Sequence, residues 1–233
     1  MSNYQLYYAP DNASLIVRIL LEELGVNYAA ILVDRSINQH HSDDYRALNP
    51  NGLIPVCVID GQNIFETAAI LQILCEKHQQ FFPGQNSKKR ANHLKWLYFI
   101  SNNIHADLRQ LFYPEQYIGA HTDSSLHRHI TVRRLHNNFS YLDAEYSHNN
   151  GLYFDGDSPC IIDFYCALAL RWSQIYPLSH PKQINPYDYP HLFNMITVLE
   201  KRAKVRRACL VEGLPEPFFS QADYPKPPEG SAL

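Results

Sequence analysis

The sequence predicts an α/β domain followed by an all-α domain. Up to residue 81, segments typical of strands and helices alternate in the order β-α-β-α-β-β-α. A stretch rich in proline, glycine and polar residues then marks a linker at 82–89. Beyond it, apolar residues recur at helical spacing without convincing strand pairs. We therefore expect an α/β domain at 1–81 and a helical-bundle domain at 90–233.

Each element of the first half has a local signal. The β-prone run at the N-terminus ends at Pro10, and the apolar helical face that follows is closed by Gly25, a residue suited to a helix C-cap. Asp60-Gly61 lies between two β-prone runs and is the strongest short hairpin signal available. The expected elements are a strand at 4–8, a helix at 15–24, a strand at 28–34, a short helix at 41–50, hairpin strands at 55–60 and 62–65, and a helix at 67–78.

The second half contains four apolar patterns of helical period and no internal repeat. A capping box is expected where Asp163 follows Cys160 by three residues, although sulfur is a weak hydrogen-bond acceptor for a cap. The tail at 215–230 has too many prolines to be a helix. The expected helices cover 94–111, 126–146, 161–175 and 191–201.

Composition excludes several classes of protein. The chain has 233 residues, 20 Lys and Arg, 23 Asp and Glu, and a formal net charge of -3, whereas a nucleic-acid-binding surface normally requires a basic excess. Five widely spaced cysteines without a CxxC pair suggest neither disulfides nor zinc and fit a reducing cytoplasm. No apolar run approaches the ~18 residues that span a bilayer, and the N-terminus lacks the pattern of a signal peptide. We expect a cytoplasmic protein that binds neither nucleic acid nor membrane.

Three segments together resemble the cytosolic glutathione transferase family. They are LLEELGVNYAAILVD (20–34), ALNPNGLIPVCVIDG (47–61) and FETAAILQIL (65–74), and the resemblance covers essentially the whole chain. It implies a thioredoxin-like N-terminal domain (βαβαββα), a helical C-terminal domain and a homodimer. WLYFISNNIHADLRQLFYP (96–114) is most similar to the bacterial beta class.

The resemblance implies a glutathione site around two motifs. In the family, the peptide matching Ile54-Pro55 is cis, and the backbone of the residue matching Ile54 pairs with the cysteinyl backbone of glutathione. Glu66 and Thr67 lie where a strand gives way to a helix, so unpaired N–H groups and the helix dipole suit the γ-glutamyl carboxylate, while Glu66 suits the ammonium. Leu53 stands where the family often has a basic residue. The alternatives are a trans proline at an edge strand and a simple helix cap.

The remaining candidates concern the glycine end and the thiol of glutathione. By resemblance, His40 contacts the glycine carboxylate; the alternative is an exposed loop histidine. A thiol with a pKa near 8.5 must be activated at neutral pH, and the candidate donors are Tyr7, Asn12, Ser14 and His105. Ser14 could instead be a plain helix cap, Tyr7 a packing residue, and His105 a partly exposed helix histidine without a role.

The resemblance implies a glutathione transferase that conjugates glutathione to small hydrophobic electrophiles in detoxification. Glutathione is the co-substrate, and no metal is expected, because His121, His127, His129 and His136 lack the spacing of a helical metal site. Ala13 stands where the beta class has its cysteine, which disfavours a cysteine-dependent thiol transferase. Two alternatives remain: a glutathione-dependent peroxidase or disulfide reductase that needs no protein cysteine, and a non-catalytic binding or scaffold protein.

Overall fold

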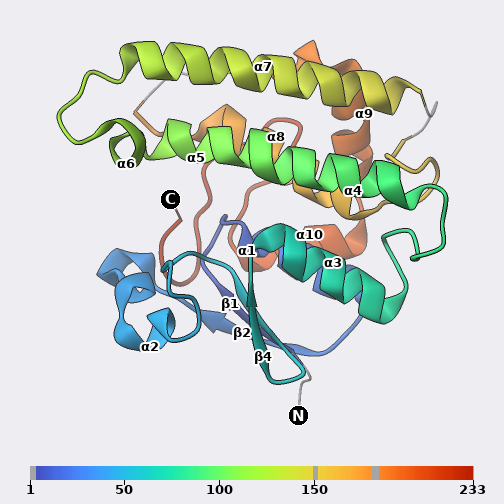
Figure 1. Cartoon of the computed structure of the whole chain (residues 1–233), viewed down its shortest axis with the longest axis horizontal. Helices are drawn as coiled ribbons and strands as arrows, with labels where there is room; N and C mark the ends of the chain where they lie inside the picture. The colour runs from blue at the N-terminus through green and yellow to red at the C-terminus, as the bar shows by residue number, and fades with distance from the viewer. Residues whose placement is uncertain (1–3, 149–151, 180–183, 233) are drawn as a thin grey trace. The chain divides into compact units, whose positions relative to one another are not determined.

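The computed structural model describes residues 4–148, 152–179 and 184–232 (Figure 1). The chain forms two compact units. The first comprises 1–87, 201–218 and 223–233, and the second comprises 88–200 and 219–222. This differs from the expected division at 1–81, 82–89 and 90–233, because most of the C-terminal segment belongs to the first unit.

A four-stranded sheet of order β2-β1-β3-β4 forms the centre of the first unit. Its strands are β1 (Tyr4–Tyr8), β2 (Tyr28–Leu32), β3 (Val56–Ile59) and β4 (Gln62–Phe65). β1 is parallel to β2 and antiparallel to β3, and β3 and β4 form the predicted hairpin. Positive φ angles at Asp60 and Gly61 confirm the turn that this dipeptide predicts.

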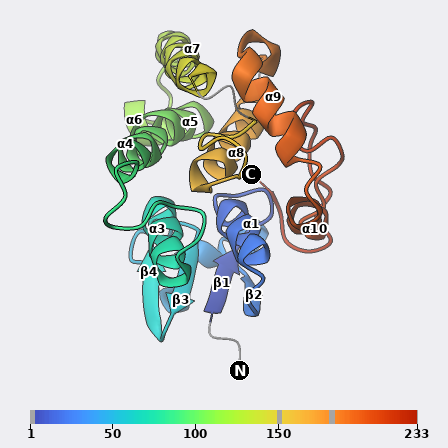
Figure 2. The ribbon, with the colours of Figure 1, turned by 90° about the vertical axis from the view of Figure 1, so that its right-hand side faces the viewer.

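Two helices cover one face of this sheet, as Figure 2 shows. They are α1 (Ser14–Leu24) and α3 (Thr67–His78), and both bury apolar side chains. Gly25 has φ 70° and ends α1 as predicted, since glycine adopts this left-handed conformation at little cost. The segment between β2 and β3 holds two 3-10 turns, η1 (Arg35–Ile37) and η2 (Gln39–His41), and the short helix α2 (Asp43–Arg46).

The sequence prediction missed α10 (Ala203–Val211), which packs against α1 within the first unit. Val205, Ala208 and Cys209 form its buried face. Arg202, just before the helix, binds the Glu23 carboxylate through two nitrogens at 2.7 and 2.8 Å. These contacts are the physical reason why the segment after residue 201 joins the α/β unit.

The second unit is helical, as predicted. Its elements are α4 (Arg90–Phe99), the π-helical turn η3 (Ile100–His105), α5 (Ala106–Phe112), α6 (Glu115–Ile118), α7 (Ser125–Ser147), α8 (Ile161–Ile175), η4 (Pro186–Asp188) and α9 (Pro190–Leu199). The expected single helix at 94–111 is interrupted by η3, where the Asn103 amide donates a hydrogen bond to the Phe99 carbonyl at 3.2 Å.

Asp163 holds the N-terminus of the fully buried helix α8. Its carboxylate accepts hydrogen bonds from the N–H groups of Cys160 at 2.7 Å and Phe154 at 2.8 Å, and from the Tyr146 hydroxyl at 2.7 Å. The predicted capping box is present, with Cys160 as its N-terminal member. All three donors are buried, so this carboxylate satisfies groups that water cannot reach.

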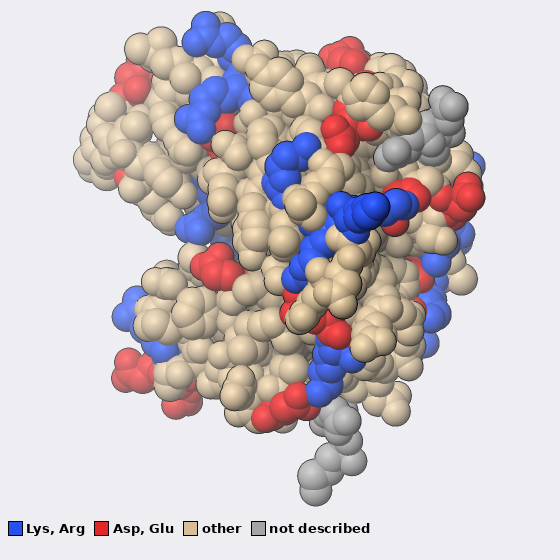
Figure 3. Space-filling model, turned by 45° about the vertical axis from the view of Figure 1, so that its right-hand side comes forward, with Lys and Arg blue, Asp and Glu red and all other residues tan. Residues whose placement is uncertain are grey.

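Charged side chains of both signs are interspersed on the face of the molecule shown in Figure 3. Among the residues that the structure describes, no helix is long and apolar enough to cross a membrane.

Candidate functional site

The strand register of the first unit brings the predicted binding motifs to one end of the sheet. Val56, the first residue of β3, lies opposite Tyr7 of β1 on one side and Phe65 of β4 on the other. Pro55 and Glu66 therefore lie next to each other, just beyond adjacent strand ends. Since β1 runs antiparallel to β3, the turn that follows Tyr8 leaves the sheet at this same end.

The turn before β3 contains the predicted cis peptide between Ile54 and Pro55. Two side chains hold this turn, because the Leu53 carbonyl accepts hydrogen bonds from the Tyr45 hydroxyl and the Asn49 amide, both at 2.8 Å. Burial raises the pKa of Tyr45, so its hydroxyl remains a donor. The sequence analysis missed the roles of Tyr45 and Asn49, since a hydrogen bond to a main-chain carbonyl has no signature in sequence. Leu53 itself is 36% exposed.

Glu66 and Thr67 form the junction between β4 and α3, as predicted. Glu66 has φ 71° and ψ 110°, a strained conformation for a residue with a side chain. Its carboxylate is exposed, and within the described chain it has no hydrogen-bond or ion-pair partner. Thr67, 6% exposed, is the first residue of α3, whose first N–H groups lack intrahelical acceptors. This junction therefore presents an unpaired carboxylate beside a helix N-terminus.

Ser14 does not occupy the position expected for a thiol donor. Its side chain has 0% exposure; the hydroxyl donates to the Ala9 carbonyl at 3.1 Å and accepts from the Ala9 N–H at 3.3 Å. It is also the first residue of α1 rather than its cap, which is Ala13. The geometry gives Ser14 a role in closing the turn between β1 and α1, with no surface from which it can reach a ligand.

Tyr7 and Asn12 are the predicted donors that remain near this end of the sheet. Tyr7 is partly buried, and its ring contacts the Tyr45 ring edge-on, with centroids 6.2 Å apart. The Asn12 side-chain oxygen is buried without a hydrogen-bond partner in the described part of the chain. Asn12 therefore keeps hydrogen-bonding capacity that the fold does not use.

A buried ion pair supports the turn that carries Asn12. Glu212, at the end of α10, accepts hydrogen bonds from the Arg18 Nε at 2.7 Å and from the Asp11 N–H at 3.0 Å. Burial raises the pKa of Glu212, and the Arg18 guanidinium opposes that rise. Sequence analysis found no sign of this contact, because 194 residues separate the two charges.

His40 lies beside the turn that precedes β3. A Cβ on Gly52 would lie 2.9 Å from the His40 carbonyl oxygen, so the two backbones are in close contact. Burial, with the nearby His41, lowers the pKa of His40. Its Nδ1 is buried and has no partner among the described residues. His40 therefore lies close to Gly52, two residues before Ile54, and its contact with the glycine carboxylate stays a prediction.

His105 belongs to the second unit and remains a predicted site residue. Its Nδ1 is 2.7 Å from the Tyr165 hydroxyl, and its ring packs against Trp172. Burial, with Arg109 nearby, lowers the pKa of His105 to about 4. The imidazole is therefore neutral at physiological pH.

The described residues offer neither an exposed cysteine nor a cluster of metal-binding side chains. All five cysteines are buried, and burial raises the pKa of Cys57 to about 12. No group of three or more His, Cys, Asp and Glu in the described ranges is arranged to hold a metal ion.

Comparison with known proteins relates this geometry to a family. Residues 13–77 match the family described as "Glutathione S-transferase, N-terminal domain". Glutathione S-transferase GstA of Escherichia coli O157:H7 is 27% identical over 90% of this chain and 99% of its own length. Glutathione S-transferase GST-4.5 of Xanthomonas campestris is 28% identical over 72% of this chain and 82% of its own.

Solved structures agree with the sequence relatives. A ternary complex of BphK, a bacterial glutathione S-transferase, is 27% identical with a TM-score of 0.77, covering 90% of this chain and 100% of that one. A glutathione transferase from Burkholderia graminis, solved with two glutathione molecules per subunit, is 25% identical with a TM-score of 0.77, covering 89% and 88%. The likenesses to GstA and BphK extend over nine-tenths of the chain, and the match to the glutathione S-transferase N-terminal domain covers residues 13–77.

Proposed function

We propose that the protein is a glutathione transferase that binds glutathione at the end of the sheet and transfers its thiolate to a small hydrophobic electrophile. One observation carries the proposal: the Ile54-Pro55 turn and the junction of Glu66 with α3 lie side by side. The first offers backbone groups to an extended peptide, and the second offers a helix N-terminus beside a carboxylate. A γ-glutamyl tripeptide carries the matching groups on adjacent residues: the cysteinyl backbone for the first and the γ-glutamyl carboxylate and ammonium for the second.

Each part of glutathione has a proposed partner. The γ-glutamyl carboxylate binds the N-terminus of α3 and Thr67, where the helix dipole favours an anion. Glu66 binds the ammonium, and Ile54 pairs with the cysteinyl backbone as an added strand would. His40 and the apolar Leu53 lie at the glycine end.

Activation of the thiol is proposed to depend on Tyr7, Asn12 and His105, and not on Ser14. A hydrogen bond donated to the sulfur stabilises the thiolate and lowers the pKa of the thiol. Support comes from the position of Tyr7 and of the turn that carries Asn12 at this end of the sheet, and from the neutral imidazole of His105. We also propose a beta-class-like assignment within the family from the segment at 96–114, with Ala13 in the place of the beta-class cysteine.

A glutathione-dependent disulfide reductase is a second candidate. The similar structure from Burkholderia graminis holds two glutathione molecules per subunit. If this protein binds in the same way, one glutathione thiolate could attack a disulfide substrate and the second could resolve the mixed disulfide, leaving oxidised glutathione and two substrate thiols. Such a route needs no protein cysteine, which fits the burial of all five.

Calorimetric titration with glutathione tests the binding site. Replacing Glu66 by Gln removes a charge-assisted hydrogen bond, so we expect affinity to fall about tenfold or more. Glu76→Gln is the matched control, because Glu76 is an exposed residue on the same helix and its carboxylate accepts a hydrogen bond from the Gln72 amide. Equal affinities in the two variants would contradict the assigned role of Glu66.

Turnover assays separate the candidate reactions. We expect conjugation of a chlorodinitrobenzene-type electrophile. The donor is identified with the variants Tyr7→Phe, Asn12→Ala and His105→Ala, because loss of the donor raises the pKa of the bound glutathione thiol. The ultraviolet absorbance of the thiolate measures that pKa. Reduction of a disulfide or hydroperoxide without conjugation would support the second candidate, and binding without any turnover would indicate a non-catalytic protein. A homodimer and a cytoplasmic location remain predictions, which light scattering and cell fractionation test.

A further inference from the structure

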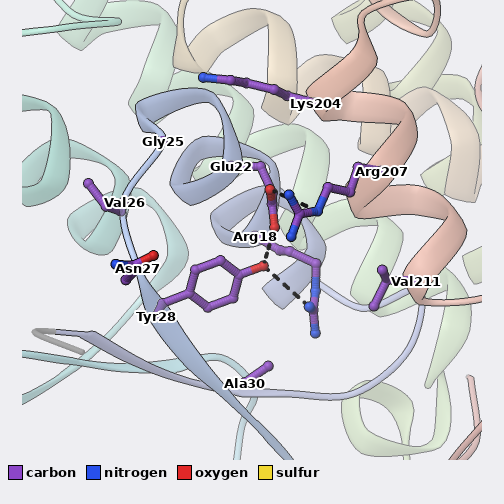
Figure 4. Close-up of a pocket in the computed structure, with 10 residues that line it drawn as sticks. All are labelled: Arg18, Glu22, Gly25, Val26, Asn27, Tyr28, Ala30, Lys204, Arg207 and Val211. Atoms are coloured by element: carbon purple, nitrogen blue, oxygen red, sulfur yellow. Dashed lines mark hydrogen bonds and ion pairs between the residues drawn. The ribbon is translucent and has the colours of Figure 1, made fainter. Parts of the chain in front are cut away.

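A pocket of about 420 Å³ lies in the first unit, between α1, the start of β2 and α10. Figure 4 shows its lining: Arg18, Glu22 and Gly25 from the end of α1, residues 26–28 and Ala30 from the segment that enters β2, and Lys204, Arg207 and Val211 from α10. The volume falls in the range of small-molecule sites, roughly 300–1,000 Å³.

The spacing of residues on α10 explains why these side chains face the pocket together. Lys204, Arg207 and Val211 are three and four residues apart and therefore share one helix face. The opposite orientation of their neighbour Arg206 shows in its bidentate contact with Glu216, with nitrogen–oxygen distances of 2.7 and 2.9 Å. α10 thus presents two cations and one apolar side chain to the pocket.

Contacts between α1 and α10 hold the walls in place without filling the pocket. Lys204 donates a hydrogen bond from Nζ to the Glu23 carbonyl at 2.8 Å, and the Glu23 carboxylate binds Arg202. The Tyr28 hydroxyl donates to the Glu22 carboxylate at 2.8 Å and lies 3.4 Å from Arg18 Nη1. These bonds form the pocket before any ligand arrives, which reduces the entropy lost on binding.

Cations outnumber anions in the lining, with Arg18, Lys204 and Arg207 against Glu22. Arg18 also pairs with Glu212 behind the pocket, which leaves one positive charge in excess of the nearby carboxylates. The chain as a whole has a net charge of -3, so this local balance is opposite in sign to that of the protein.

Two of these cations retain unused hydrogen-bonding capacity. The Arg207 side chain is 73% exposed, and its ion pair with the Glu22 carboxylate is long, at 3.5 Å. Arg18 is 4% exposed, and within the described residues its Nη2 has no hydrogen-bond partner. A guanidinium can donate up to five hydrogen bonds, so the exposed Arg207 can bind an additional anionic partner, whereas the unpaired Arg18 Nη2 is buried.

Apart from Asn27, the side chains of the remaining lining offer apolar surface. Val26, Ala30 and Val211 and the ring of Tyr28 line the pocket beside the charged groups. A lining of this kind suits a ligand with an apolar body and one anionic group, since each part meets a matching surface.

We propose that this pocket binds a small organic anion, with a phosphate or carboxylate group bound by Arg207 and Lys204 and an aromatic or aliphatic body packed on Tyr28 and Val211. It is a second binding site, separate from the proposed glutathione site at the end of the sheet. The competing explanation is that these cations only attach α10 to α1. That explanation accounts for Lys204 but leaves the weakly paired Arg207 without a role.

Calorimetric titration of the whole protein with phenyl phosphate, with and without saturating glutathione, tests the proposal. We expect saturable binding in both conditions and binding about tenfold weaker for the neutral analogue benzyl alcohol. Arg207→Gln should weaken phenyl phosphate binding about tenfold, with Arg206→Gln on the same helix as the unchanged control. Val211→Glu should abolish binding by adding a carboxylate to the lining, whereas Leu210→Glu, at the neighbouring exposed position, should not.

Three results would overturn the proposal. They are the absence of saturable binding up to about 10 mM phenyl phosphate, displacement of phenyl phosphate by glutathione, and equal effects of the lining and control substitutions. Thermal midpoints of all four variants verify that each is folded; Arg207 and Val211 are both largely exposed, so these substitutions leave the core unchanged. Because the titration without glutathione stands alone, failure of the proposed transferase function would not affect this result.

Discussion

The backbone of Glu66 predicts opposite effects of one substitution on stability and on glutathione binding. Its φ of 71° and ψ of 110° lie outside the regions that residues with a Cβ favour. Such a conformation costs about 1–3 kcal/mol, and glycine would relieve it. Glycine also gives the unfolded chain more conformational freedom, which costs about 0.5–1 kcal/mol. The expected net gain for Glu66→Gly over Glu66→Ala is therefore about 0–2.5 kcal/mol.

Both variants lack the carboxylate that is proposed to bind the ammonium of glutathione. A hydrogen bond to a charged group contributes about 1.5–3 kcal/mol, which corresponds to a loss of affinity of roughly 10- to 150-fold. Glu66→Gly should therefore be the more stable variant and should bind glutathione as weakly as Glu66→Ala does.

Urea unfolding measures the first effect, and calorimetric titration with glutathione measures the second. Gln79→Gly is the matched control, because Gln79 has φ 53° at the other end of α3. It should gain up to about 1 kcal/mol without any change in glutathione affinity. If the Gly and Ala variants at position 66 are equally stable, the backbone stores no strain there. If both retain wild-type affinity, Glu66 does not bind the ammonium.

Three further predictions concern the rest of the fold. Asp163→Ala leaves three buried donors unsatisfied and should lower the free energy of unfolding in urea by about 3–5 kcal/mol. The control Asp123→Ala removes an exposed acceptor before α7 and should lower it by about 1 kcal/mol or less. Equal losses would show that burial of the Asp163 network is unimportant. Burial lowers the pKa of His105 to about 4 in the folded state, below the value near 6.5 in the unfolded state. The free energy of unfolding should therefore be unaffected by His105 above pH 6.5 and should fall by up to about 3 kcal/mol as the pH drops to 4. If His105→Gln shows the same pH dependence of unfolding as the wild type, His105 is not the cause of that fall. Gly52→Ala should lower the free energy of unfolding by about 2–4 kcal/mol and weaken glutathione binding, because the added Cβ would meet the His40 carbonyl oxygen. In the control Gly61→Ala the Cβ meets open space, and the loss should be about 1–2 kcal/mol. Similar losses would exclude the steric contact as the cause.

Several features of the site were predictable because their signals are local. The hairpin depends on two residues that accept positive φ angles, and both occur together at Asp60-Gly61. The start of α3 follows from the change of period after Phe65, and the structure begins the helix at the predicted Thr67. The pairing of Ile54-Pro55 with Glu66 follows from the hairpin alone, since the two segments flank its strands.

Ser14 shows the limit of the same reasoning. A polar residue before an apolar helix can be a cap, a donor to a ligand or a closing contact of the turn, and all three have the same sequence. The choice depends on the position of the Ala9 main chain. In the structure, the N–H and the carbonyl of Ala9 both form hydrogen bonds with the Ser14 hydroxyl.

The sequence by itself determined the order of strands and helices up to residue 78, the helical character of the second half and the segments that resemble the glutathione transferase family, because each rests on residues near one another in the chain. Only the tertiary structure decided that α10 belongs with the α/β unit and that Glu212 pairs with Arg18. The same is true of the pocket between α1, β2 and α10. These features depend on burial and on contacts between residues nearly 200 positions apart in the chain. Neither a buried ion pair nor the shape of a cavity produces a periodic pattern in the amino-acid sequence.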